Sequence, residues 1–267
     1  MIASMMTGKE PVYSWRPSEK YLHFFQAFNV GDRLAIDLVA RIIAERGMRF
    51  RHYNGGTRRL FAVGSVLRVA QENDVVWGSG INGKTLHRWE GFHRLDLRAV
   101  RGPLTAHKLS EMGMEVPDIY GDPGILADRY FPLRPTGTKP YWVVPHLREP
   151  AHLYPGQPLL SPKQLPGKFL RKLVQAQRVV SSSLHGLVLA EAYGIPAIPI
   201  INRSGEHPFK YQDYYEGTGR EFPGFSETVA DALRREPPPG IPAGVKDRLM
   251  AAFPWDLWEK PRSPAAE

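Results

Sequence analysis

The chain has 267 residues, 42% hydrophobic and 23% charged, and these ordinary globular values exclude a disordered or fibrous protein. It contains no cysteine, which excludes disulfides and thiolate chemistry. The formal net charge of +8 favours anionic partners, but the arginines are dispersed and no zinc spacing or aromatic ribonucleoprotein signature is present, so we expect an anionic small substrate or membrane surface rather than nucleic acid.

The cytoplasm is the location that the sequence favours. The N-terminus lacks the basic start and apolar core of a signal peptide, and no segment approaches the roughly 18 apolar residues of a membrane span. The absence of cysteine suits a reducing compartment.

The first expected element is a helix that follows Asn29 and ends at Gly47, because Leu34, Leu38 and Ile42 form an apolar stripe at i, i+4 spacing. Asp32 is expected to cap this helix. Asn29 and Asp32 then either face a ligand at the helix N-terminus or serve ordinary turn chemistry.

Two short apolar runs follow, at residues 60–65 and 74–80, and each stops at glycine or serine as parallel strands entering ligand loops do. The loop after the second run contains Gly78, Ser79 and Lys84. Its backbone amides and the lysine ammonium group can approach an anion.

Two further strands precede helices in this half. Residues 95–100 lead to Arg101, and Pro103 suits the first turn of a helix that runs to Gly113. Arg101 either makes a bidentate contact to a carboxylate or phosphate or forms a salt bridge on the domain surface. Asp122 follows the next strand and is either a site residue or a helix cap.

The chain divides at a segment rich in proline, glycine and threonine. The boundaries are residues 1–131 for an N-terminal α/β domain, 132–139 for a linker, 140–244 for a C-terminal α/β domain, and 245–267 for a closing helix and disordered tail. In the second domain His146 ends the strand at 141–146, and a helix is expected at 169–176.

The run at residues 178–201 predicts a strand, a helix that ends at Gly194, and a second strand. Such a βαβ unit is right-handed and binds ligands beyond the carboxyl ends of its strands. Ser182, Ser183 and His185 lie at that end, where helix N–H groups can hold an anion. Either His185 faces a ligand, or the serines cap the helix and His185 is a satisfied polar residue.

An aromatic and polar segment, residues 202–219, contains Arg203 and Lys210. It either stacks on sugar rings or packs over the boundary between the two domains. Residues 236–242 form a proline-rich connector, and a closing helix is expected within 245–258.

Six motifs, in this order, resemble the polysaccharide pyruvyl transferase family: Asn29-Val-Gly-Asp32, Gly78-Ser-Gly80, Val100-Arg-Gly-Pro-Leu-Thr105, Gly121-Asp-Pro-Gly124, Val143-Val-Pro-His146 and the run from Ser181 to Pro196. The segment Phe209-Lys-Tyr-Gln-Asp-Tyr-Tyr215 also resembles the subgroup of succinoglycan-type ketal pyruvate transferases. The resemblance covers roughly residues 25 to 220.

This resemblance implies two Rossmann-like parallel-sheet domains facing a cleft, as in GT-B glycosyltransferases. It also implies transfer of pyruvate from phosphoenolpyruvate onto a sugar of a lipid-linked exopolysaccharide repeat unit, as a cyclic ketal. Such an acceptor, together with the basic charge, implies peripheral contact with the inner membrane face. The family's leucine-histidine-glycine histidine corresponds to His185, and its strand-turn-helix arginine to Arg101, so these two are the expected catalytic residues.

One position departs from the family, because Ser183 stands where several members carry arginine. Arg101, Lys84 and Arg203 are the expected substitutes for its phosphoenolpyruvate contact. No compact His/Asp/Glu cluster with ligand spacing is visible, so neither a metal nor a cofactor is expected. The substrate-binding set predicted from the sequence is Asn29, Asp32, Gly78, Ser79, Lys84, Asp122, His146, Ser182, Ser183, Arg203 and Lys210.

Two other functions fit the same sequence. A GT-B-like glycosyltransferase can hold the diphosphate of a nucleotide sugar at the same helix N-termini. A non-catalytic carbohydrate-binding protein of polysaccharide assembly is also compatible with serine at position 183.

Overall fold

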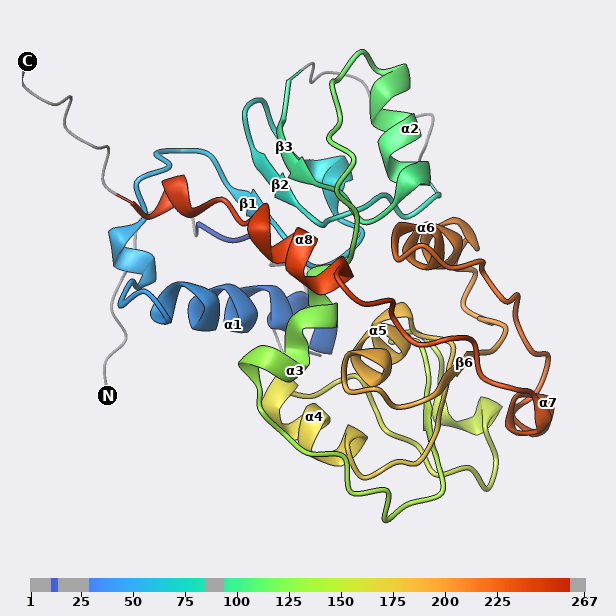
Figure 1. Cartoon of the computed structure of the whole chain (residues 1–267). Coiled ribbons are helices and arrows are strands. Elements are labelled where there is room, and N and C mark those ends of the chain that lie inside the picture. The colour runs from blue at the N-terminus through green and yellow to red at the C-terminus, as the bar shows by residue number, and fades with distance from the viewer. Residues whose placement is uncertain (1–10, 14–28, 85–93, 260–267) are drawn as a thin grey trace, which may run out of the picture.

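The structure is a computed structural model that describes residues 11–13, 29–84 and 94–259 (Figure 1). Within these ranges the chain forms two three-stranded parallel sheets surrounded by helices, which confirms the predicted α/β class. The N-terminal residues on which the signal-peptide prediction rests and the predicted disordered tail lie outside the described residues.

The N-terminal sheet has its strands in chain order: β1 (Leu60–Phe61), β2 (Val75–Trp77) and β3 (Asp96–Ala99). Every residue of β1 and β2 is buried, as expected for a parallel sheet covered on both faces. Single bridges add Val12 beside β1 and Tyr120 beside Val100, at the end of β3. The predicted strand before Asp122 is therefore reduced to one bridging residue.

The C-terminal sheet also keeps chain order: β4 (Trp142–Val144), β5 (Val179–Ser181) and β6 (Ala197–Pro199). Helix α5 (Leu184–Ala192) joins β5 to β6, and Ser181 lies opposite Pro199 in the parallel register. This confirms the predicted βαβ unit.

The remaining helices surround the two sheets: α1 (Val30–Ala44), α2 (Pro103–Glu111), α3 (Ala127–Tyr130), α4 (Pro166–Leu173), α6 (Phe209–Gly217), α7 (Val229–Arg234) and α8 (Val245–Ala251). Short 3-10 turns complete the described elements: η2 (Phe50–His52), η3 (Leu67–Val69), η4 (Pro123–Leu126), η5 (Ala151–Leu153) and η6 (Trp255–Leu257). None of the helices in the described ranges is both long and apolar enough to cross a membrane.

One hydrophobic core extends through both halves, because the same buried cluster contains Leu34 of α1, Trp77 of β2 and Leu187 of α5. Helix α1 packs against α4, and α2 packs against α6 (Figure 1). The C-terminal segment returns to the N-terminal sheet, where the Trp77 indole N–H donates to the Leu249 carbonyl at 2.8 Å. The domain boundaries and the GT-B-like arrangement stay predictions.

Several local predictions need correction. Asn29, not Asp32, caps α1, because the Asn29 side chain accepts from the Gly31 N–H and the helix already begins at Val30. Helices α6 and α7 were not predicted. The predicted closing helix is confined to α8, since Pro254 interrupts the chain before the short turn η6.

Candidate functional site

The candidate site lies where η4, α5, α6 and the segments after β2, β3 and β4 meet; we call this region the seam. Parallel strands present their carboxyl ends at one edge of a sheet, so the residues that follow them gather there. Arg101 follows β3, and His146 follows β4. The charges of Lys210 and Arg101, and that of His146 when it is protonated, act on His185, so these predicted residues lie near one another.

His185 and Asp122 form the centre of the seam. His185 lies in the first turn of α5, and Asp122 caps η4 by accepting the Gly124 N–H at 2.9 Å. The second carboxylate oxygen, Oδ2, lies 4.0 Å from His185 Nε2. Both of these atoms are buried and have no hydrogen-bond partner in the structure. Such pairs are uncommon in a folded interior and mark a place where a ligand can supply the missing partners.

Burial shifts the pKa values of Asp122 and His185 in opposite directions. It raises the pKa of Asp122 to about 6, against the Gly124 hydrogen bond and the Arg101 charge. Burial, followed by the charges of Lys210 and Arg101, lowers the pKa of His185 to about 3. At neutral pH the imidazole is therefore uncharged before a ligand binds, and the carboxyl group of Asp122 titrates close to the working range.

Gly31 leaves the space that the imidazole ring of His185 occupies. The ring packs directly against its backbone, so that a Cβ added at Gly31 would lie 2.1 Å from His185 Nδ1. The glycine of the Asn29-Val-Gly motif thus leaves room for the histidine, although the two residues are far apart in the sequence.

A second group of charged side chains surrounds Glu206, and we call it the Glu206 cluster. Lys84 Nζ lies 2.5 Å from Oε1 of Glu206, and Lys210 Nζ lies 2.6 Å from Oε2. His146 Nε2 and Arg148 approach Oε1 at 3.8 Å and 3.9 Å. Three predicted substrate residues, Lys84, His146 and Lys210, therefore come together around a carboxylate that the sequence did not single out.

Burial and neighbouring charges shift the pKa values of Glu206 and His146. Burial by itself raises the pKa of Glu206, but the charge and hydrogen bond of Lys210, with the hydrogen bond from Lys84, lower it to about 2. Burial and the Lys210 charge lower the pKa of His146 to about 4. Burial lowers the pKa of Lys210 as well, against the charge and hydrogen bond of Glu206. The cluster thus gathers three basic side chains and one carboxylate around an imidazole that is uncharged at neutral pH.

Arg101 is fully buried, and its guanidinium group is used within the protein. Its Nε donates to Asp213 Oδ2 at 2.9 Å, and its other two nitrogens donate to Ser65 Oγ and to the Ile81 carbonyl. The ion pair joins the start of α2 to α6 in the interior, not on a domain surface as one reading expected. Each of its three nitrogens thus contacts a protein group, so Arg101 links the segments around the seam from within the interior and is not open to a ligand in this structure.

The serines at the end of β5 are likewise engaged with the protein. Ser182 Oγ donates to Glu149 and accepts from the His146 N–H at 2.9 Å. Ser183 is the N-cap residue of α5, but its side chain makes no capping hydrogen bond. Glu149 also accepts from the Arg203 N–H at 2.6 Å, and thereby ties the loop after β4 to the loop after β6.

The remaining predicted residues have separate roles. Ser79 is buried and donates to the Gly64 carbonyl at 3.0 Å, while Gly78 has a φ of +83° and packs closely against Pro123. The Arg203 side chain is exposed. Asp32 lies in the first turn of α1, and its side chain is outside what the structure describes.

The tyrosines of α6 are unavailable for stacking on sugars. Tyr211, Tyr214 and Tyr215 are fully buried, and the hydroxyl groups of Tyr214 and Tyr215 donate to Glu191. These aromatic side chains therefore pack in the interior, where α6 contacts α2.

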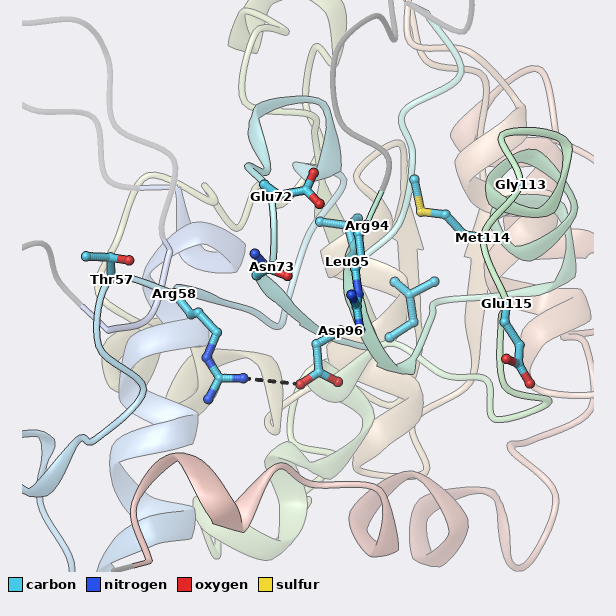
Figure 2. A pocket seen from close by; sticks show the side chains of 11 residues that line it. Thr57, Arg58, Glu72, Asn73, Arg94, Leu95, Asp96, Gly113, Met114 and Glu115 are labelled. Atoms are coloured by element: carbon cyan, nitrogen blue, oxygen red, sulfur yellow. Dashed lines mark hydrogen bonds and ion pairs between the residues drawn. The ribbon is translucent and has the colours of Figure 1, made fainter. Parts of the chain in front are cut away.

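A pocket of about 710 Å³ lies elsewhere, at the amino ends of β2 and β3 (Figure 2). Arg58 and Asp96 form an ion pair of 3.4 Å across it. Because it opens at the edge of the sheet opposite to Arg101, we do not assign it to the seam. Among the residues placed by the structure, no three His, Asp or Glu side chains are arranged to hold a metal ion.

Sequence reasoning missed Glu206, Asp213, Glu149 and Gly31. Asp213 lies 112 positions from Arg101, and Lys84 lies 122 positions from Glu206, so no local pattern joins these pairs. The nearer contacts, Lys210 four residues after Glu206 and His146 three residues before Glu149, did not mark a site by themselves. Gly31 carried a usable signal: a glycine in the first turn of a helix is unfavourable unless something occupies the space of its side chain.

Comparison with known proteins identifies relatives of this chain. The family model described as polysaccharide pyruvyl transferase matches residues 29–204. The succinoglycan biosynthesis protein ExoV of Rhizobium meliloti is 30% identical over 176 residues, which are 60% of this chain and 54% of that protein. An uncharacterized protein of Acanthamoeba polyphaga mimivirus is 27% identical over 201 residues, which are 67% of this chain and 66% of that protein.

The aligned region thus spans only about half the length of ExoV. No solved structure matches the chain significantly. The likeness to the GT-B fold accordingly stays a prediction.

Proposed function

This chain belongs to the polysaccharide pyruvyl transferase family, and from that membership we propose that it transfers pyruvate from phosphoenolpyruvate onto two hydroxyl groups of a sugar, forming a cyclic ketal. One observation carries the proposal: the seam combines two unpartnered, buried, proton-handling atoms with a cluster of cations suited to an anionic donor. A transferase that must both anchor an anion and move protons needs these two components side by side.

The donor's charges match the Glu206 cluster. Phosphoenolpyruvate carries a carboxylate and a phosphate group, and Lys84, Lys210 and Arg148 supply three cations near them. These residues replace the arginine that several family members carry at the position of Ser183. Arg203, which is exposed beside the same loop, is a fourth candidate contact.

In the proposed reaction the two protons released by the sugar hydroxyl groups are both taken up by the products. A proton adds to the methylene carbon of phosphoenolpyruvate, and the central carbon becomes electrophilic. The first sugar hydroxyl adds there and loses its proton, phosphate leaves with the electrons of its C–O bond, and the second hydroxyl closes the ring and loses its proton. One transferred proton ends in the new methyl group, and the other leaves with phosphate.

His185 and Asp122 are the residues that we assign to these proton transfers. Because the pKa of His185 is lowered to about 3 and that of Asp122 is raised to about 6, the carboxyl group is the first of the two to hold a proton. A phosphate dianion bound beside the imidazole favours its protonated form, so donor binding moves the proton toward His185. Arg101 positions these groups through its buried pair with Asp213.

The acceptor that we propose is a sugar of a lipid-linked exopolysaccharide repeat unit. This follows from the family and from the name of the ExoV relative, which ties that protein to succinoglycan biosynthesis. A cytoplasmic location with peripheral contact at the inner membrane face would bring the basic chain to such an acceptor.

Release of inorganic phosphate from phosphoenolpyruvate, with and without a lipid-linked oligosaccharide extract from the producing cell, tests the proposal. We expect acceptor-dependent release that falls by about 10² to 10⁴ in His185→Ala, since one general acid/base group contributes that much. The control is His152→Ala, which removes an exposed histidine. Equal turnover in both variants would remove His185 from the mechanism.

Calorimetry distinguishes the donor class. Binding of a UDP-sugar without binding of phosphoenolpyruvate would favour a nucleotide-sugar glycosyltransferase, because the same cations can hold a diphosphate. Binding of phosphoenolpyruvate without turnover on any extract would favour a carbohydrate-binding protein that has lost its chemistry.

A further inference from the structure

We infer that Glu206 is an internal occupant of the anion site: its carboxylate takes the place of the donor's carboxylate or phosphate group, and the donor binds by displacing it. The inference rests on the proposed function for the identity of the donor. It adds a residue that competes with the substrate for the same cations.

The first argument is geometric. The two carboxylate oxygens of Glu206 divide the cations between them, with Lys84 at 2.5 Å from Oε1 and Lys210 at 2.6 Å from Oε2. His146 and Arg148 approach Oε1 from further away, at 3.8 Å and 3.9 Å. A carboxylate or phosphate group of a ligand would be held by the same set of donors.

The second argument is the excess of charge. Lys84, Lys210 and Arg148 supply three positive charges against the single negative charge of Glu206. Glu149, the next carboxylate, forms no ion pair with these cations and accepts instead from two hydroxyl groups and two backbone N–H groups. Its charge also acts on His146, so two negative charges stand against three positive ones. A cluster with an excess of positive charge, in which Lys84 and Lys210 are largely shielded from water and Arg148 is exposed, attracts a ligand with more negative charge than one carboxylate.

The third argument concerns the stability of the empty site. The Lys210 side chain is only 8% exposed, and an unpaired ammonium group at that depth would be costly. Glu206 keeps it paired while no ligand is present. An arriving donor then exchanges one anion for another, so the cations are paired both before and after binding.

The fourth argument is that Glu206 can leave without unfolding its surroundings. It lies on a surface loop between β6 and α6, in which the neighbouring residues Gly205 and His207 are exposed. The Asn202 side chain accepts the Glu206 backbone N–H at 3.2 Å, and so holds the loop independently of the carboxylate. The Glu206 side chain is itself only 8% exposed, so its rotation toward the exposed residues of this loop is the motion that releases the cations to a ligand.

Calorimetric titration of phosphoenolpyruvate, and separately of inorganic phosphate, into wild-type protein and Glu206→Gln tests the inference. We expect the variant to bind both anions about tenfold more tightly, equivalent to about 1.4 kcal/mol, because the internal competitor is gone. Glu206→Asp, whose shorter side chain cannot span both ammonium groups, should fall between the two. Glu227→Gln removes an exposed carboxylate elsewhere in the same half and should bind as the wild type does.

Thermal unfolding with and without phosphate checks the folding of each variant. Glu206→Gln should melt at a lower temperature than the wild type without phosphate and gain more from its addition, since a tighter ligand stabilises more. Unchanged or weaker affinity for both anions in Glu206→Gln would overturn the inference and make Glu206 a structural partner of the lysines. Tighter phosphate binding without any phosphoenolpyruvate turnover would support the inference while refuting the proposed transfer.

Discussion

Replacing Gly31 by alanine is expected to displace the His185 ring and disable the seam while the fold is kept. A Cβ built on Gly31 lies 2.1 Å, 2.3 Å and 2.5 Å from three ring atoms of His185, whereas ordinary contact begins at 3.4 Å. The imidazole turns on two side-chain bonds and the backbone of α1 is fixed in a helix, so the ring moves. That motion carries Nε2 away from Asp122.

The stability change is the difference of two terms. Alanine is better than glycine in a helix by up to about 1 kcal/mol. Overpacking a buried site costs about 1–3 kcal/mol. Gly31→Ala should therefore lower the free energy of unfolding by about 0–3 kcal/mol, and the same substitution should be stabilising in a His185→Ala background. We expect a coupling energy between the two sites of about 1–3 kcal/mol.

Urea unfolding of the wild type, the two single variants and the double variant measures this coupling, and phosphate release measures turnover. Gly31→Ala should reduce turnover nearly as much as His185→Ala does, although it removes no functional group. Additive stability effects together with wild-type turnover in Gly31→Ala would refute the packing that the structure shows between α1 and α5.

Three further predictions follow from buried charges. Asp213→Asn should lower the free energy of unfolding by about 3–5 kcal/mol, because it leaves the fully buried Arg101 without its counter-ion; urea unfolding measures this, and Asp231→Asn, on an exposed pair, should change little. The folded-state pKa of His185 is depressed, so the unfolded chain alone binds its proton between pH 6.5 and about 3, and stability should fall as the pH falls through that window. The raised pKa of Asp122 has the opposite effect: below about pH 6 the folded chain binds this proton more readily than the unfolded chain, which adds stability. The test therefore compares two proteins. On acidification His185→Asn should lose less free energy of unfolding than the wild type, and the difference should be at most about 1.4 kcal/mol per pH unit. Lys210→Met should weaken binding of phosphoenolpyruvate by about tenfold or more in calorimetry, and unaltered affinity would place the donor away from the Glu206 cluster.

The elements with a strong local signal were the predictable ones. The run at 178–201 predicted β5, α5 and β6 because its apolar period changes from strand to helix and back. Asp122 was predicted as a cap or a site residue, and the structure makes it both a cap for η4 and the nearest carboxylate to His185. Helix α6 escaped prediction because its tyrosines and charges form no apolar stripe; its stability comes from contacts with α2 and with Glu191.

The partner of Arg101 could not be predicted from the position of this residue in the sequence. A strand-to-helix turn places an arginine at the ligand edge of a sheet, and two readings of its partner were open. The choice depended on Asp213, which lies 112 positions later in the chain and enters the interior only because α6 packs on α2. The same is true of Lys84 and Lys210, which are 126 positions apart and meet at one carboxylate.

The sequence by itself determined the α/β class, the βαβ unit around His185 and the family to which the chain belongs, because these depend on local periodicity and on motifs in a set order. Only the tertiary structure decided which candidates meet: it placed His185 Nε2 opposite Asp122, committed Arg101 to the interior and gathered Lys84, His146 and Lys210 around Glu206. The physical reason is that hydrogen bonds and ion pairs act over a few ångströms, and such distances between remote residues are set by packing and not by spacing along the chain.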